Sequence, residues 1–151
     1  MGHGISHSLI KALRKVPGFD LLEEADLVEI AGASVNLLWA EGNCIFKKGQ
    51  PGEALYIVLS GQVRIYDEVD GREVEIARTG AGDFFGEHSL LLDTTHTKNV
   101  QALEDTELLV LSKHSFAALL ASNPELEQHI HRTLEARRSE AEEKYQTTTP
   151  S

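Results

Sequence analysis

Glycine spacing in the middle of the chain limits its fold more than any other feature. Eight glycines lie from residue 42 to residue 86, and they separate short apolar segments. Regularly spaced short strands with such turn residues between them are typical of an all-β sandwich or barrel. The expected strands are 35–39, 44–46, 54–59, 62–66, 74–78 and 83–85.

One hairpin and two later strands complete the predicted sheets. Asp70-Gly71 is a strong hairpin signal, and it is expected to pair segment 63–65 with segment 74–76. Two more strands are expected at 99–103 and 107–111, which brings the total to about eight.

The segment before the strands has helical periodicity. Ser6 or Ser8 can cap a first helix, which Pro17-Gly18 ends. Asp20 and Glu23 then form the expected capping box of a second helix. Two helices are therefore expected before the first strand.

The helical period returns after the last strand. Ser112 can cap a short helix, and Asn123-Pro124 opens a longer one, because proline is favoured at a first helical position. The longer helix carries a narrow apolar stripe at Leu126, Ile130 and Leu134. Its basic residues alternate with glutamates, so we interpret that part of the helix as a solvated face. Helices on both sides of the strands give an α+β fold class.

One stretch carries most of the chemistry. Phe85 ends an apolar run, Gly86 turns the backbone, and Glu87 follows at once. A strand, a glycine turn and a helix start direct several backbone N–H groups at one spot, which favours an anion. Glu87 cannot bind that anion, so its carboxylate needs another partner, such as a ligand hydroxyl. An anion beside a hydroxyl describes a sugar phosphate.

Residues 83–102 resemble the phosphate-binding cassette of the cyclic nucleotide-binding domains, found in the catabolite activator protein and in protein kinase A regulatory subunits. Phe85-Gly86-Glu87, Ser89-Leu90 and Val100-x-Ala102 are in register with the family pattern. The resemblance spans roughly residues 8–144. It implies an antiparallel β-roll (a double-stranded β-helix or jelly roll) with N-terminal helices, a short cassette helix and C-terminal lid helices.

The resemblance implies roles for the cassette residues. Glu87 matches the glutamate that accepts a hydrogen bond from the ribose 2′-hydroxyl; as a purely structural residue it would be solvent-exposed at a helix start. Gly86 and Ser89 match donors to the cyclic phosphate, and Thr97 can add a hydroxyl donor. Asn99 stands where a threonine or serine can touch the base, and it does not distinguish adenine from guanine. The expected ligand-binding residues are Phe85, Gly86, Glu87, Ser89, His96, Thr97, Lys98 and Asn99.

His96 stands where the family has the arginine that neutralises the cyclic phosphate. Arginine offers a permanent charge and a two-pronged fork, whereas a neutral histidine offers one donor. Losing such a charge typically costs about 2–5 kcal/mol. Since a histidine has a reference pKa of about 6.5, we expect His96 to gain charge, and the ligand to bind more tightly, as the pH falls towards 6. Lys98 can compensate in part if no bulge turns it away from His96. The alternative is a loop histidine and a solvated lysine.

The long C-terminal helix is expected to close over the base as a lid. Leu90 and Leu91 of the cassette, with the apolar stripe of the long helix, are the contacts that would couple ligand and lid. Cutting the chain after Asn123 is therefore expected to change ligand affinity more than the fold.

Composition excludes several classes of function. The formal net charge is −10, from 14 basic and 24 acidic residues, so a nucleic acid would be repelled. No apolar run reaches the roughly 18 residues of a membrane span, and no signal-peptide pattern opens the chain. The single cysteine, Cys44, fits a reducing, cytoplasmic setting.

At 151 residues the chain supports one domain. The expected parts are 1–7, a flexible N-terminus or the remnant of an expression tag; 8–145, the cyclic nucleotide-binding-like domain; and 146–151, a disordered tail. No helix-turn-helix can follow residue 145, so we expect a stand-alone sensor or a piece of a larger protein.

The leading interpretation is a regulatory sensor domain that binds cAMP, cGMP or a related phosphate-bearing ligand, with helix movement as its output. The alternative is a degenerate domain that binds no nucleotide and serves as an interaction or dimerisation module, with a larger effector protein or a second copy as partner. An enzyme is the third possibility, and it would need a metal. His88, His96 and His129-x-His131 do not form a ligand set. No catalytic residue, metal or cofactor is therefore expected.

Overall fold

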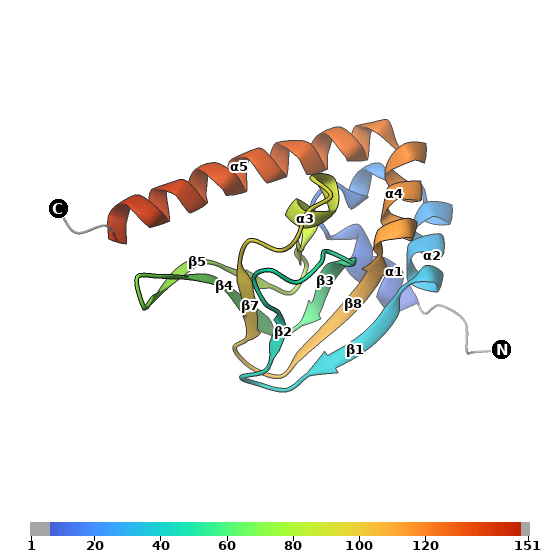
Figure 1. Cartoon of the computed structure of the whole chain (residues 1–151). Coiled ribbons are helices and arrows are strands. Elements are labelled where there is room, and N and C mark those ends of the chain that lie inside the picture. Colours follow the sequence, from blue (N-terminus) through green and yellow to red (C-terminus); the bar gives the residue numbers. More distant parts are fainter. Residues whose placement is uncertain (1–6, 149–151) are drawn as a thin grey trace.

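Two antiparallel sheets form the predicted β-roll in the computed structural model, which describes residues 7–148 (Figure 1). The strands are β1 (Val35–Trp39), β2 (Cys44–Phe46), β3 (Ala54–Ser60), β4 (Gln62–Val69), β5 (Arg72–Gly80), β6 (Phe84–Phe85), β7 (Asn99–Ala102) and β8 (Thr106–Ser112). One sheet has the strand order β1-β8-β3-β6, and the other has the order β2-β7-β4-β5. The prediction of about eight strands in an antiparallel roll is confirmed.

The β4–β5 hairpin has the predicted turn but a different register. Asp70 and Gly71 have φ angles of 53° and 78°, as a tight hairpin turn requires. A bulge at 65–66 shifts the pairing, so Val63 lies opposite Thr79. The predicted pairing of 63–65 with 74–76 is therefore wrong, because the turn puts Val69 opposite Arg72 and the bulge adds one residue, so 63–65 lie opposite 77–79.

Three helical elements precede the sheets: α1 (His7–Arg14), the 3-10 helix η1 (Phe19–Leu21) and α2 (Glu24–Ala33). The capping box of α2 is formed by Glu23 and Asp26, whose side chains each accept from the other's backbone N–H. The predicted box of Asp20 and Glu23 is therefore wrong, because Asp20 lies within the 3-10 turn and α2 begins later.

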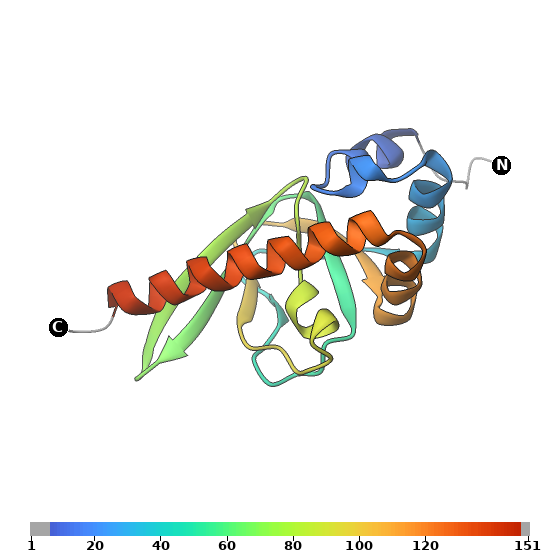
Figure 2. The same cartoon turned by 90° about the horizontal axis from the view of Figure 1, so that it is seen from above.

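The remaining helices are the cassette helix α3 (Glu87–Leu91), α4 (Lys113–Ser122) and α5 (Pro124–Thr148). Ser112 caps α4 as predicted, since its Oγ accepts from the Ser115 N–H at 3.2 Å. Figure 2 shows α5 passing over α3 and continuing beside the β4–β5 hairpin. Residues 146–148 belong to α5, so their prediction as part of a disordered tail is wrong. Residues 1–6 and 149–151, which the other predictions for the two ends concern, lie outside the described residues.

The first half of α5 belongs to the main core. Leu126 and Ile130 are fully buried, together with residues of α1, α2, β3, β8 and α4, and Leu134 is 3% exposed. A second, smaller core fills the space between the sheets, with members such as Phe46, Val63 and Phe85. The apolar stripe thus packs the first half of α5 into the protein, so this half is part of the fold and does not match the expected lid.

This burial corrects the expected effect of truncation. Ending the chain after Asn123 removes three buried side chains worth about 5–9 kcal/mol together, which is comparable with the whole stability of a domain. We expect that chain to lose its cooperative thermal transition, whereas a chain ending after Leu134 keeps one. Far-UV circular dichroism melts of both chains test this. A cooperative melt of the shorter chain near the parent's Tm would show that no part of α5 is core.

Candidate functional site

A cavity of about 590 Å³ opens between the second half of α5, the cassette and the β4–β5 hairpin. Most of the predicted ligand-binding residues line it: Phe85, Gly86, Glu87, Ser89, His96, Thr97 and Lys98. Asn99 is the exception among the predicted residues. It does not line the cavity, and its Oδ1 accepts a hydrogen bond from the Lys48 backbone N–H at 2.9 Å. Asn99 therefore stabilises the turn after β2, and its predicted contact with the base does not fit this position.

Gly86 makes the sharp turn from β6 into α3. Its φ of 93° lies in the left-handed region, where a side chain is strained. A Cβ at this position would also lie 3.1 Å from the Ala54 carbonyl oxygen and 3.0 Å from the Tyr56 ring. Glycine is therefore the residue that allows the cassette to pack against β3.

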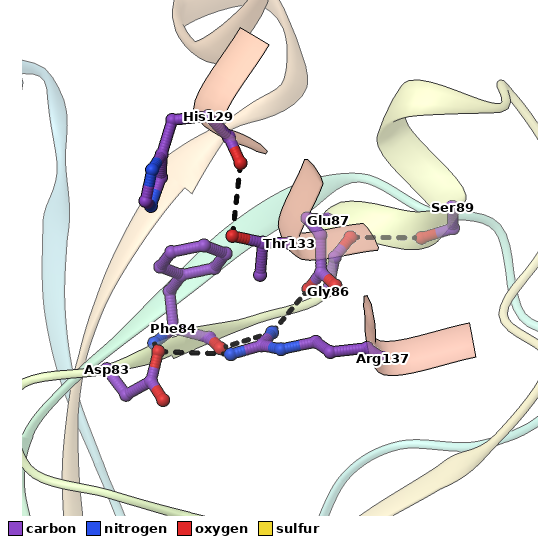
Figure 3. Close-up of polar contacts among 8 residues, drawn as sticks. All are labelled: Asp83, Phe84, Gly86, Glu87, Ser89, His129, Thr133 and Arg137. Carbon is purple, nitrogen blue, oxygen red and sulfur yellow. Dashed lines mark hydrogen bonds and ion pairs between the residues drawn. The ribbon is translucent and has the colours of Figure 1, made fainter. Parts of the chain in front are cut away.

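Glu87 is buried, with 4% of its surface exposed. A glutamate with a purely structural role at this helix start is expected to be solvent-exposed. Figure 3 shows Arg137 of α5 reaching the cassette. Its Nη1 donates to Glu87 Oε1 at 2.9 Å and to the Phe84 carbonyl at 2.8 Å, and its Nη2 donates to Asp83 Oδ1 at 3.0 Å. Burial raises the pKa of Glu87, and the guanidinium opposes that shift. The ion pair thus ties the second half of α5 to the cassette.

Sequence reasoning missed Arg137, which it placed on a solvated helix face. The signal was its position three residues after Leu134, at the end of the stripe Leu126, Ile130 and Leu134. Residues three and four apart share one face of a helix, so Arg137 continues the buried side of α5. Arginine supplies the charge that a buried carboxylate needs on that side.

A second contact fastens the far end of α5. The Tyr145 hydroxyl donates to Asp67 Oδ2 of β4 at 2.5 Å, and Lys48 Nζ lies 3.1 Å from Asp67 Oδ1. Burial and the hydrogen bond to Asp67 raise the pKa of Tyr145, so the phenol stays protonated and can donate. The second half of α5 is thus fixed to the cassette at Arg137 and to β4 at Tyr145.

His96 is buried and packed rather than free in a loop. Its ring stacks on Phe46 with centroids 3.5 Å apart and planes 6° apart, and its Nδ1 lies 3.0 Å from Ser89 Oγ. Burial, and to a lesser extent the proximity of His88, lowers the pKa of His96 to about 4. The expectation that His96 gains its charge towards pH 6 is therefore wrong for the ligand-free protein, because burial disfavours the charged ring.

The sequence profile of the cyclic nucleotide-binding domain matches residues 37–123, which is more than half of the chain. The chain belongs to the cyclic nucleotide-binding domain family. The resemblance inferred from the cassette is thereby confirmed, and this family's members include cyclic nucleotide-binding regulatory domains.

Known relatives agree with the family. The Cyclic AMP receptor protein of Thermus thermophilus is 38% identical over 106 residues, covering 70% of this chain and 49% of that protein. The crystal structure of the Thermus thermophilus Catabolite Activator Protein superposes with a TM-score of 0.75 at 32% identity, covering 87% of this chain and 62% of that one. The chain thus spans about half of the length of this curated relative.

A third relative is the regulatory subunit of a cAMP-independent protein kinase A from Trypanosoma brucei. Its structure matches with a TM-score of 0.79 at 26% identity, covering 91% of this chain and 49% of that chain. A form of that protein with three substitutions, one of which introduces an arginine, is bound to cAMP in its A site.

Within residues 7–148 of this cyclic nucleotide-binding domain, no helix combines the length and the apolar character that crossing a membrane requires.

The low pKa of His96 predicts a pH-dependent stability. The unfolded ring has a pKa near 6.5 and the folded ring one of about 4, so the folded state binds fewer protons between these values. The contribution of His96 to the free energy of unfolding is therefore complete above pH 6.5. It is lost as the pH falls towards 4, by up to about 3 kcal/mol. Urea unfolding from pH 7.5 to 4.5 measures it.

Two variants isolate the contribution of His96. His96→Gln keeps a polar group beside Ser89 but cannot titrate, so its free energy of unfolding should fall less steeply below pH 6.5. His114 is exposed, and His114→Gln should follow the parent. Equal slopes for the parent and His96→Gln would contradict the neutral, buried ring.

Proposed function

We propose that the chain is a regulatory sensor domain that binds a cyclic nucleotide, cAMP or cGMP, in the cavity beneath α5. The observation that carries the proposal is the buried carboxylate of Glu87, which lines the cavity and is oriented by Arg137 at 2.9 Å. A carboxylate has two oxygens and several acceptor sites, so Glu87 can keep Arg137 and also accept from a ribose 2′-hydroxyl. The Thermus thermophilus relative, a Cyclic AMP receptor protein, supports the choice of ligand class.

The cavity suits the size and polarity of a nucleotide. Its volume of about 590 Å³ lies within the range of small-molecule sites. Ile65, Ile76, Val100 and Leu134 give it apolar walls that can pack against a base. The cassette contributes the polar side chains of Glu87 and Ser89, beside which the ribose and phosphate would lie. The ribose phosphate would therefore make polar contacts, and the base would pack against apolar side chains.

The output of binding would be the position of the second half of α5. Arg137 and Tyr145 hold this segment over the cavity, and Glu87 is shared between the segment and the ligand. A ligand that fixes Glu87 therefore also stabilises the closed position of α5. A larger effector protein or a second copy of the chain would detect that position.

A second candidate function is a domain that does not respond to cyclic nucleotides and acts as an interaction or dimerisation module. The observation that favours it is the neutral, stacked His96 at the place of the family's arginine. The Trypanosoma brucei relative is a regulatory subunit of a cAMP-independent kinase, and its cAMP-bound form carries an introduced arginine. One substitution can therefore separate the two candidates.

Calorimetric titration with cAMP and cGMP at pH 7.5 tests both candidates. His96→Arg should tighten binding at least about tenfold, or roughly 1.4 kcal/mol, because a permanent charge then meets the phosphate. His114→Arg adds the same charge outside the cavity and should behave as the parent. Glu87→Gln should weaken binding by roughly tenfold or more, since a hydrogen bond to a charged acceptor is lost. No binding by the parent or by His96→Arg would favour the interaction module.

A further inference from the structure

The cavity is lined by four cationic side chains, and they are not equally free. Arg137 is neutralised by the buried Glu87 at 2.9 Å, whereas Arg78 has an exposed partner three residues away in the sequence, Glu75 at 2.9 Å. The other two are Lys98, in the segment before β7, and Arg138 on α5. Arg138 has an exposed partner, Glu135, and Lys98 is in no ion pair of the described residues, so a ligand with a negative charge would first meet Lys98.

Lys98 has no carboxylate within the 4 Å of an ion pair among residues 7–148. Its Nζ lies 3.4 Å from Thr97 Oγ1 and 5.4 Å from the centre of the Tyr145 ring. Asp67 is the acidic residue that acts on it electrostatically. The Asp67 oxygens already accept from Lys48, from Tyr145 and from the Glu68 backbone N–H. Lys98 thus keeps a charge that no anion of the protein neutralises at contact distance.

His88 also lines the cavity, from the cassette helix α3. Its Nδ1 is buried without a hydrogen-bond partner, so a proton there would be an unsatisfied buried donor. The proton is therefore better placed on Nε2, which leaves Nε2–H as the donor of the ring. Burial lowers the pKa of His88, and so do the charges of Lys98 and Arg138. All three residues line the same cavity.

Arg138 lines the cavity from α5. Its partner is Glu135, at 3.4 Å in an exposed pair one turn earlier in the helix. Exposed pairs of this kind contribute little and exchange partners readily. A lysine, an arginine and a histidine donor therefore line one cavity from three different segments of the chain. Like charges are costly to gather, and a bound anion would offset that cost.

We propose that Lys98, His88 and Arg138 form the subsite for the anionic group of the ligand, a phosphate ester of a ribonucleotide. They supply at this site the charge that His96 does not. The inference rests on the proposed function, since it assigns the phosphate end of the same cavity. Lys98 is its central residue, because it is half-buried and lacks a carboxylate partner among the described residues.

The test compares charged and uncharged ligands on matched variants. Calorimetry at pH 7.5 measures cAMP and cGMP against adenosine and guanosine, with the parent, Lys98→Gln, Lys98→Arg and Lys47→Gln. Lys98→Gln should weaken cyclic nucleotide binding at least tenfold and change nucleoside binding less than twofold. Lys98→Arg should restore nucleotide binding. Lys47 is exposed and lies outside the cavity, so Lys47→Gln should match the parent.

Arg138→Gln provides a second, independent variant, with a smaller loss confined to the nucleotides. Thermal melts of all variants should match the parent, because neither Lys98 nor Arg138 is part of the core. Equal losses for nucleotides and nucleosides, or no loss in Lys98→Gln, would overturn the anion subsite and leave the proposed function standing. A parent that binds neither class would overturn both.

Discussion

The ion pair between Glu87 and Arg137 is the interaction on which the site depends. A carboxylate that is 4% exposed is costly to bury unless a charge and hydrogen bonds compensate it. Arg137 compensates it from α5, and the same guanidinium donates to Asp83 and to the Phe84 carbonyl. Cassette and helix are therefore held together by one guanidinium, whose buried partner is the Glu87 carboxylate. That carboxylate also lines the cavity, so ligand contact and helix position are physically linked.

This link divides α5 into two parts with different roles. Up to Leu134 the helix is core, since Leu126 and Ile130 are fully buried. Beyond Leu134 it is held by polar contacts, at Arg137 to the cassette and at Tyr145 to β4. Hydrophobic burial of this kind is non-directional and persistent, whereas polar contacts to a few side chains can exchange partners. In the proposed function, the part of α5 beyond Leu134 is therefore the segment whose position would depend on the ligand.

Local patterns predicted the fold and most of the cassette. Turn chemistry at Asp70-Gly71 and the glycine at residue 86 act over a few residues, so the sequence shows them directly. The partners of Glu87 and His96 could not be predicted in the same way. Arg137 and Phe46 lie 50 residues away in the chain, and only the packed fold brings them into contact. Burial also decided the charge of His96, and exposure cannot be predicted from a reference pKa.

Hydrogen–deuterium exchange of the ligand-free protein tests the central claim most directly. If the Glu87–Arg137 pair holds the second half of α5 in place, Arg137→Gln and Glu87→Gln should each raise exchange in residues 138–146 by about tenfold, corresponding to roughly 1.4 kcal/mol of local stability. Residues 126–134 should stay protected, and the exposed change Arg132→Gln should alter neither segment. Unchanged exchange in 138–146, or an equal rise along the whole of α5, would contradict a lid held by this buried pair.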